Sequence, residues 1–210
     1  MRHRDAGPKA SFLQKTEQKQ APVLIEARNL KQHFRIRSDY TIHAVDDVSF
    51  SIREGEIMAL VGETGCGKST TARTLAGIYR PTGGEIFYQG ERVPDKKDPF
   101  GMRKKMQTEI QMIFQDPQSS LNERAKVGYI VGEGLMNVRP DLSAAERDEK
   151  VRQALLDVGL LPEFASRFPH EFSGGQRQRI GIARALIVEP EFIIACLLYT
   201  SDAADEEDSV

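Results

Sequence analysis

The stretch "ALVGETGCGKSTTARTLAG", residues 59–77, decides the fold class of this chain. Its central octet, Gly62 to Ser69, fits the pattern G-x-x-x-x-G-K-[ST], and the sequence predicts an apolar strand before it and a helix after it. Glycines let the backbone wrap so that successive N–H groups point at one anion, and the following helix adds the positive end of its dipole. The stretch therefore predicts a loop that holds the phosphates of a nucleoside triphosphate.

The spacing within this loop assigns roles to single side chains. Lys68 is expected to reach the β- and γ-phosphates, the Ser69 hydroxyl to ligate Mg²⁺, and Thr70 to add a phosphate contact. The expected cofactors are thus ATP and Mg²⁺. The predicted ATP-binding residues of the loop are Gly62, Glu63, Thr64, Gly65, Cys66, Gly67, Lys68, Ser69 and Thr70. A glycine-rich turn that matches by chance is the alternative, and the flanking strand and helix argue against it.

Length, charge and cysteine content exclude several classes of protein. A chain of 210 residues that is 40% hydrophobic and 29% charged can form one core, with or without a small subdomain. The formal net charge of −2 gives no reason to expect a nucleic-acid partner. Two cysteines make no disulfide framework. Since no apolar run approaches the ~18–20 residues that span a bilayer, we expect any membrane role to depend on a partner.

Hydrophobic patterns predict further elements on both sides of the loop. Strands are expected in the stretches 23–30, 44–52, 57–62, 84–90 and 110–115, and a helix over 68–76. Residues 1–21 are polar and are expected to form a disordered leader, and the charged stretch 95–105 a surface connection. The segment 119–172 is expected to be mostly helical, with a capping box between Ser143 and Glu146.

A second motif, "HEFSGGQRQRIGIARAL" at residues 170–186, lies about 110 residues after the phosphate loop. Ser173 and two glycines at an expected helix start would form another anion-binding cap. Two such caps in one chain suggest a dimer in which each cap closes on the nucleotide of the other subunit. The residues expected to contact the partner's nucleotide are Ser173, Gly174, Gly175 and Gln176.

Together the two motifs resemble those of the ATP-binding subunits of ABC transporters, over about residues 23–195. The resemblance implies an α/β fold, the P-loop NTPase fold of ABC type: a RecA-like core with an antiparallel β subdomain and a helical signature subdomain at about 118–175. It implies that Gln115, in "MIFQDP", touches Mg²⁺ and senses the membrane partner, and that Phe34, in "LKQHFRI", stacks on adenine. Tyr40 lies near Phe34 in the sequence, and a core role for Phe34 is the alternative.

The amino-acid sequences of four stretches are similar to those of one branch of this family. "AVDDVSF", "GETGCGKST", "FQDPQSSLN" and "HEFSGGQRQRIGIARAL" resemble the second ATPase subunit of the oligopeptide/dipeptide importers, a branch that also contains nickel importers. The resemblance implies a sister ATPase, as a hetero- or homodimer, two membrane permeases and an extracytoplasmic solute-binding protein. It implies a peripheral location on the cytoplasmic face of a prokaryotic plasma membrane. A soluble ABC protein of translation or DNA repair is the alternative.

Histidines contribute no predicted site. His170 precedes the second motif and is expected to pack at the start of its helix rather than to act in catalysis. His3, His33 and His43 do not have metal-ligand spacing in the sequence.

The end of the chain departs from the family pattern. After the expected strand "EFIIA" the family would continue with Asp and Glu, for the Mg²⁺ shell and for the attacking water, but Cys196 and Leu197 stand there. We therefore expect no catalytic residue in this chain and little hydrolysis. Residues 196–210 are interpreted as translated transposon-end sequencing adapter, which would leave residues 22–195 as a partial ATP-binding domain, incomplete at its C-terminus. A natural subunit that binds ATP without hydrolysing it, or a true truncation, are the alternatives.

Overall fold

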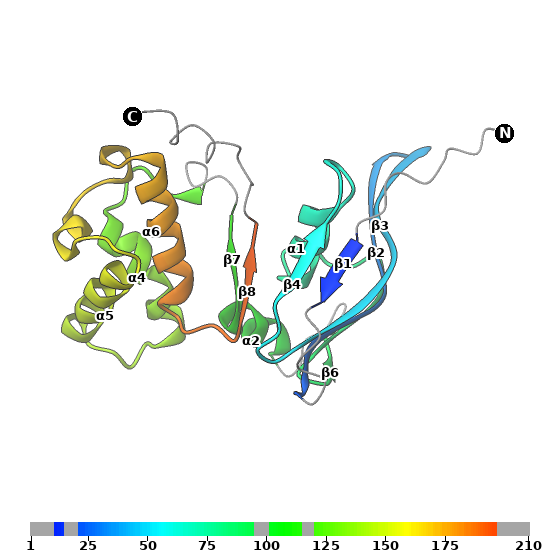
Figure 1. The fold of residues 1–210 in the computed structure, drawn as a ribbon, viewed down its shortest axis with the longest axis horizontal. Helices are drawn as coiled ribbons and strands as arrows, with labels where there is room; N and C mark the ends of the chain where they lie inside the picture. The colour runs from blue at the N-terminus through cyan, green and yellow to red at the C-terminus, as the bar shows by residue number, and fades with distance from the viewer. Residues whose placement is uncertain (1–10, 15–20, 95–100, 115–119, 197–210) are drawn as a thin grey trace, which may run out of the picture. The chain divides into compact units, whose positions relative to one another are not determined.

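The computed structural model describes residues 11–14, 21–94, 101–114 and 120–196. The chain divides into two compact units, a first unit at Met1–Gln107 and a second unit at Thr108–Val210. Figure 1 shows the helices and strands of both units. The predicted phosphate loop belongs to the first unit and the "SGGQ" motif to the second, and each unit is described by itself.

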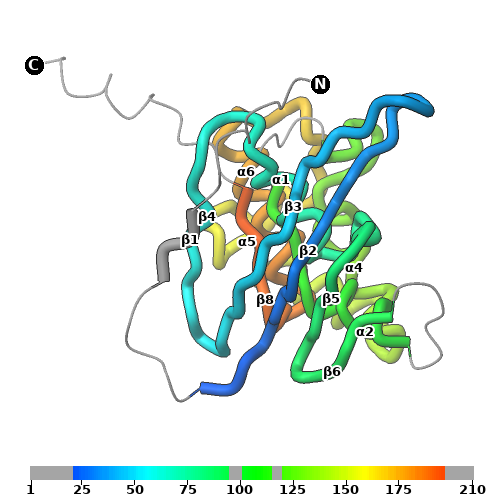
Figure 2. The backbone as a smooth tube through the Cα atoms, turned by 90° about the vertical axis from the view of Figure 1, so that its right-hand side faces the viewer, coloured from blue at the N-terminus to red at the C-terminus, as the bar shows by residue number. Residues whose placement is uncertain are grey.

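The first unit is built around a four-stranded antiparallel sheet in the order β3-β2-β5-β6. Figure 2 shows β3, β2 and β5 side by side. Apolar side chains of these strands form a core, and Ile25, Leu30 and Tyr88 are fully buried. The strands are β2 (Val23–Arg37), β3 (Tyr40–Arg53), β5 (Gly83–Tyr88) and β6 (Glu91–Arg92). The hairpin of β2 and β3 is longer than the stretches that the sequence predicted.

The phosphate-loop segment of the first unit begins at β4 (Met58–Val61) and ends with α1 (Lys68–Leu75). β4 pairs antiparallel with β1 (Ser11–Gln14), which lies in the leader that we expected to be disordered. A strand edge offers unpaired N–H and C=O groups, so a nearby extended segment can pair with it whatever its side chains are. The structure also places α2 (Met102–Glu109) where the sequence predicted the end of a surface connection.

In the described part of the second unit, α-helices pack around one apolar core. These are α4 (Val127–Val138), α5 (Ala144–Asp157) and α6 (Gly174–Leu186), with the short 3-10 helices η1 (Pro162–Ser166) and η2 (Pro169–Glu171) between the last two. Val131, Leu155 and Ile180, one from each α-helix, lie in the core with no more than trace exposure. The predicted capping box of α5 is confirmed, because Ser143 Oγ accepts from the Glu146 N–H and the Glu146 carboxylate accepts from the Ser143 N–H.

Two parallel strands complete the second unit. β7 (Ile110–Ile113) pairs with β8 (Phe192–Ala195), from Ile110 opposite Phe192 to Ile113 opposite Ala195. Because the strands are parallel, the chain leaves both at the same edge of the sheet. Cys196, which follows β8, therefore lies at the same end of this two-stranded sheet as Ile113, the last residue of β7. Among the described residues, no helix combines the length and the apolar character needed to cross a bilayer.

Candidate nucleotide-binding site

The loop between β4 and α1 turns back on itself at two glycines. Gly65 has φ of 84° and Gly67 has φ of 95°, both in the left-handed region that favours glycine. A Cβ on Gly67 would also collide with the carbonyl of Ala44 in β3, so a side chain does not fit here. The structure thus explains the glycine at Gly67 by two independent constraints, its backbone angle and the close approach of β3.

Lys68 is held by the loop that it follows. Its Nζ donates to the carbonyl oxygens of Gly62, at 2.6 Å, and of Glu63, at 2.7 Å, and lies 3.7 Å from Cys66 Sγ. Two backbone carbonyls of the loop therefore hold the ammonium group. Lys68 is also the first residue of α1, so the group lies near the first N–H groups of this helix. Gly67, the N-cap of α1, supplies no side chain to cap these groups. Such a loop has the donors and the positive charge that a phosphate requires.

The remaining residues of the predicted loop lie along the same turn. Glu63, Thr64 and Ser69 are exposed, while Cys66 and Thr70 are half-buried. Thr71 Oγ1 donates to the Gly67 carbonyl at 3.0 Å, and Thr74 Oγ1 donates to the Thr70 carbonyl at 2.8 Å. Both hydroxyls bond to carbonyls at the start of α1, where the first N–H groups of a helix have no acceptor within the helix.

Phe34 lies in the same unit as the phosphate loop. It is half-buried on β2, and its ring meets that of Tyr79 edge-on at a centroid distance of 5.3 Å. The structure therefore gives Phe34 an aromatic neighbour that the sequence did not predict. Gln115, the residue expected to touch Mg²⁺, lies outside the described residues.

The "SGGQ" motif forms the start of α6, as predicted. Ser173 is the N-cap, its Oγ accepting from the Gln176 N–H at 3.3 Å, and Gln176 Oε1 accepts from the Ser173 N–H at 2.9 Å. Ser173, Gly174 and Gly175 are exposed. A Cβ built on either glycine would meet none of the described atoms within 4 Å. The start of this helix is thus open to a ligand or partner that brings negative charge.

At the edge where β7 and β8 end, a thiol stands where the family pattern has an aspartate. Cys196 follows β8, is half-buried, and its N–H donates to the Ile113 carbonyl at 2.9 Å. This backbone bond continues the parallel pairing of the two strands. Leu197, the second of the two substituted positions, lies outside the described residues.

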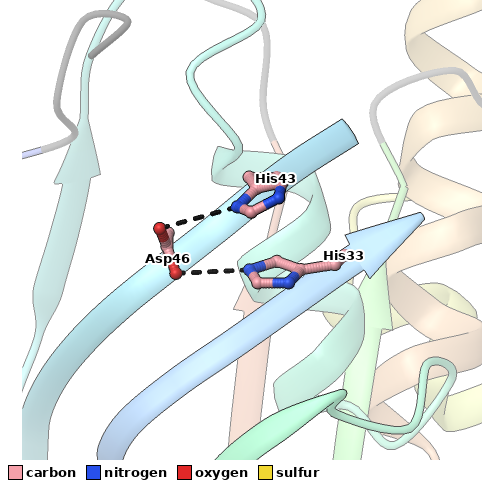
Figure 3. Close-up of side chains that lie close together, drawn as sticks. All are labelled: His33, His43 and Asp46. Carbon is pink, nitrogen blue, oxygen red and sulfur yellow. Dashed lines mark hydrogen bonds and ion pairs between the residues drawn. The ribbon is translucent and has the colours of Figure 1, made fainter. Parts of the chain in front are cut away.

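The structure brings together three possible metal ligands that spacing in the sequence did not indicate. His33, His43 and Asp46 lie together on the β2–β3 hairpin, with one ligand atom of each within 4.8 Å of the others. Figure 3 shows His33 on one strand and His43 and Asp46 on the other, with both imidazoles turned toward the carboxylate. Sequence spacing missed this group because strand pairing, and not proximity along the chain, brings His33 to His43.

The chain was compared with known proteins. The sequence profile of the family described as "ABC transporter" matches residues 45–195. The chain is 52% identical to the oligopeptide transport ATP-binding protein OppF of Bacillus subtilis over 82% of this chain and 56% of that protein. It is 46% identical to the protein of the same name in Escherichia coli, over 82% of this chain and 53% of that protein. The chain thus spans just over half the length of these curated relatives.

Solved structures agree with the sequence relatives. A dimeric ATP-binding cassette, solved in a post-hydrolysis state with ADP and Pi, superposes with a TM-score of 0.71 at 27% identity. The superposition covers 82% of this chain and 73% of that one. The predicted fold class is therefore confirmed. With its phosphate loop, its "SGGQ" helix and a family match over most of its length, the chain belongs to the ABC transporter family.

Proposed function

We propose that this chain is the ATP-binding subunit that energises an ABC importer of oligopeptides or dipeptides. The observation that carries the proposal is the loop in which the Lys68 ammonium group donates to the carbonyls of Gly62 and Glu63. The choice of solute rests on the relatives, which are named oligopeptide transport ATP-binding proteins.

The proposed nucleotide site consists of the phosphate loop with Phe34. The residues present fit a triphosphate, because the loop offers backbone N–H groups, a lysine and room at Gly65, whose added Cβ would meet none of the described atoms within 4 Å. Lys68 would leave the loop carbonyls for the phosphates, and the exposed Ser69 hydroxyl would be a ligand for Mg²⁺, with Gln115 as the second. When bound, Mg²⁺ supplies charge neutralisation at the phosphates. Phe34 would stack on adenine.

Ser173, Gly174, Gly175 and Gln176 are proposed to contact the nucleotide of a partner ATPase. The exposed start of α6 supports this role, because its N–H groups and helix dipole favour a negatively charged group. The remaining partners proposed are two membrane permeases and an extracytoplasmic solute-binding protein. They would hold the chain at the cytoplasmic face of a prokaryotic membrane.

Hydrolysis by this chain is proposed to be weak. Cys196 occupies the position of a Mg²⁺-shell aspartate, and Leu197 that of the glutamate that would polarise water. A neutral thiol is a poor ligand for Mg²⁺, and leucine cannot accept a proton. Cys196 therefore favours a second candidate function, an ATP-binding scaffold that does not hydrolyse.

Ser173→Ala should weaken ATP-dependent dimerisation without weakening ATP binding by the variant's own loop. A hydrogen bond to a charged group contributes about 1.5–3 kcal/mol, so the dimer should dissociate about 10- to 100-fold more readily. Sedimentation of the full chain with ATP and Mg²⁺, alone and with the sister ATPase, measures this. ATP affinity is measured separately by calorimetry.

A matched variant separates the ligand role of Ser173 from its structural role as a helix cap. Losing the cap alone costs about 0.5–2 kcal/mol of helix stability. Ser173→Asp retains a capping carboxylate but places a negative charge against a phosphate, so this variant should fold normally and still fail to dimerise. Dimerisation of Ser173→Asp at the unmodified level would contradict the proposed contact.

Recruitment to membranes tests the transport role. The full chain is expressed with and without the two permeases, and its share in the membrane fraction is measured. We expect membrane association that depends on the permeases. Association that is the same without them, or no association in either case, would favour an ABC protein outside transport. ATP turnover by the same complex would exclude the non-hydrolysing scaffold.

A further inference from the structure

We propose that His33, His43 and Asp46 form a binding site for a late first-row divalent cation, with Zn²⁺ as the representative ion. His33 Nε2 lies 3.2 Å from Asp46 Oδ1, and His43 Nδ1 lies 3.7 Å from Asp46 Oδ2. The two imidazole rings stack at a centroid distance of 3.9 Å with 24° between their planes. Both rings thus present a nitrogen to the same carboxylate, as Figure 3 shows.

An irregularity in strand pairing creates this arrangement. Gln32 pairs with Val45 and His33 pairs with His43, so Ala44 is an extra residue in β3. In a regular strand, residues three apart such as His43 and Asp46 point to opposite faces. The extra residue reverses the alternation between them and brings Asp46 to the face of His43. The pairing of His33 with His43 then adds the third ligand from β2.

The same irregularity lies beside the phosphate loop. The carbonyl of Ala44 is the group that a Cβ on Gly67 would strike. Since His43 precedes Ala44 and Asp46 follows two residues later, an ion held by both would fix the backbone that packs against Gly67. The site differs from the proposed Mg²⁺ site at Ser69 in its ligands.

The separations between ligand atoms suit a small cation. Zn²⁺ bonds of about 2.0–2.1 Å in tetrahedral geometry place ligand atoms about 3.3–3.4 Å apart. The 3.2 Å between His33 Nε2 and Asp46 Oδ1 is close to this separation, and His43 Nδ1 lies 3.7 Å from the other carboxylate oxygen, Oδ2. One ligand atom from each of the three residues lies within 4.8 Å of the others. The side chains of His43 and Asp46 are more than half exposed. Small rotations can therefore bring both imidazole nitrogens within bonding distance of one ion, with water completing its coordination shell.

The chemistry of the donors selects the class of ion. Two imidazoles and one carboxylate suit Zn²⁺, Cu²⁺, Ni²⁺ and Co²⁺, whereas Mg²⁺ and Ca²⁺ prefer oxygen ligands alone. An aspartate side chain is ionised at neutral pH, so Asp46 supplies an anionic ligand. Lys31 Nζ lies 3.9 Å from Asp46 Oδ1. An exposed pair of this kind is weak and gives way readily to a divalent ion.

Titration of the full chain with ZnCl₂, without nucleotide and in a buffer that does not chelate metals, tests the proposal. We expect one Zn²⁺ per chain by calorimetry. Loss of even an outer-shell partner costs about 10- to 100-fold in metal affinity, so His43→Asn and Asp46→Asn should each weaken binding by at least about tenfold. His170→Asn is the matched control, since it removes an exposed histidine of the second unit and should leave the affinity unchanged.

Co²⁺ spectra identify the ligands independently of affinity. With nitrogen and oxygen ligands, bound Co²⁺ should show ligand-field bands and no thiolate charge-transfer band. A thiolate band would assign the ion to Cys66 or Cys196 and overturn the proposal, as would equal Zn²⁺ affinity in His43→Asn or the absence of binding. Circular dichroism of His43→Asn and Asp46→Asn establishes that each variant is folded, so that a lost affinity is a lost ligand.

Discussion

Gly67→Ala should destabilise the first unit by about 2–5 kcal/mol and abolish nucleotide binding. The left-handed backbone costs a residue with a side chain about 1–2 kcal/mol, and forcing an extra carbon into packed structure costs about 1–3 kcal/mol more. Here the obstacle is the carbonyl of Ala44, which belongs to the backbone and cannot rotate away as a side chain would. Either β3 or the start of α1 must shift, and Lys68 would lose its place at the centre of the loop. Urea unfolding and ATP titration of the variant measure the two effects.

Gly65→Ala is the control for this prediction. Gly65 has a similar φ, 84° against 95°, but among the described atoms a Cβ there meets nothing within 4 Å. The variant should lose only the backbone contribution of about 1–2 kcal/mol. Equal destabilisation by Gly65→Ala and Gly67→Ala would contradict the close packing of β3 against the phosphate loop.

Leu155→Ala should destabilise the second unit by about 2–5 kcal/mol, the range for removing a large side chain from a packed core. Leu155 has no exposed surface, and the core around it contains residues from α4, α5 and α6. A cavity here would loosen all three helices, including the one that begins with Ser173. Unfolding in urea, followed by circular dichroism, reports the change.

Leu156→Ala is the control, because it makes the same substitution at the next residue of α5. Leu156 is 50% exposed, and surface substitutions usually change stability by no more than about 0.5 kcal/mol. If the two variants unfolded at the same urea concentration, the orientation of α5 in the structure would be wrong.

Local sequence predicted the local structure of the segments at residues 59–77 and 170–186. The octet from Gly62 to Ser69 specifies its own loop, because glycines, lysine and helix start are consecutive in the chain. The cap of α5 was likewise predictable, since Ser143 and Glu146 are only three residues apart. The start of α6 at the "SGGQ" motif was predicted for the same reason.

Features that depend on strand register could not be predicted in this way. His33 meets His43 through the pairing of β2 with β3, and the Ala44 carbonyl approaches Gly67 although the two are distant in the sequence. The local sequence gives no signal for either contact. Pairing with β4 gives Ser11–Gln14 a strand structure that its polar surroundings did not suggest. The helix at Met102–Glu109 was missed because its charged composition and the nearby Pro99 suggested a surface connection.

Calorimetric titration of the full chain with ATP and Mg²⁺ tests the central claim most directly. We predict one ATP per chain, with Lys68→Ala binding about 10- to 100-fold more weakly, as expected for a lost charged hydrogen bond of about 1.5–3 kcal/mol. Lys150→Ala, which removes an exposed lysine paired with Glu189 in the second unit, should bind ATP as the unmodified chain does. No binding by the unmodified chain, or equal binding by Lys68→Ala, would contradict the assignment of the loop as the nucleotide site.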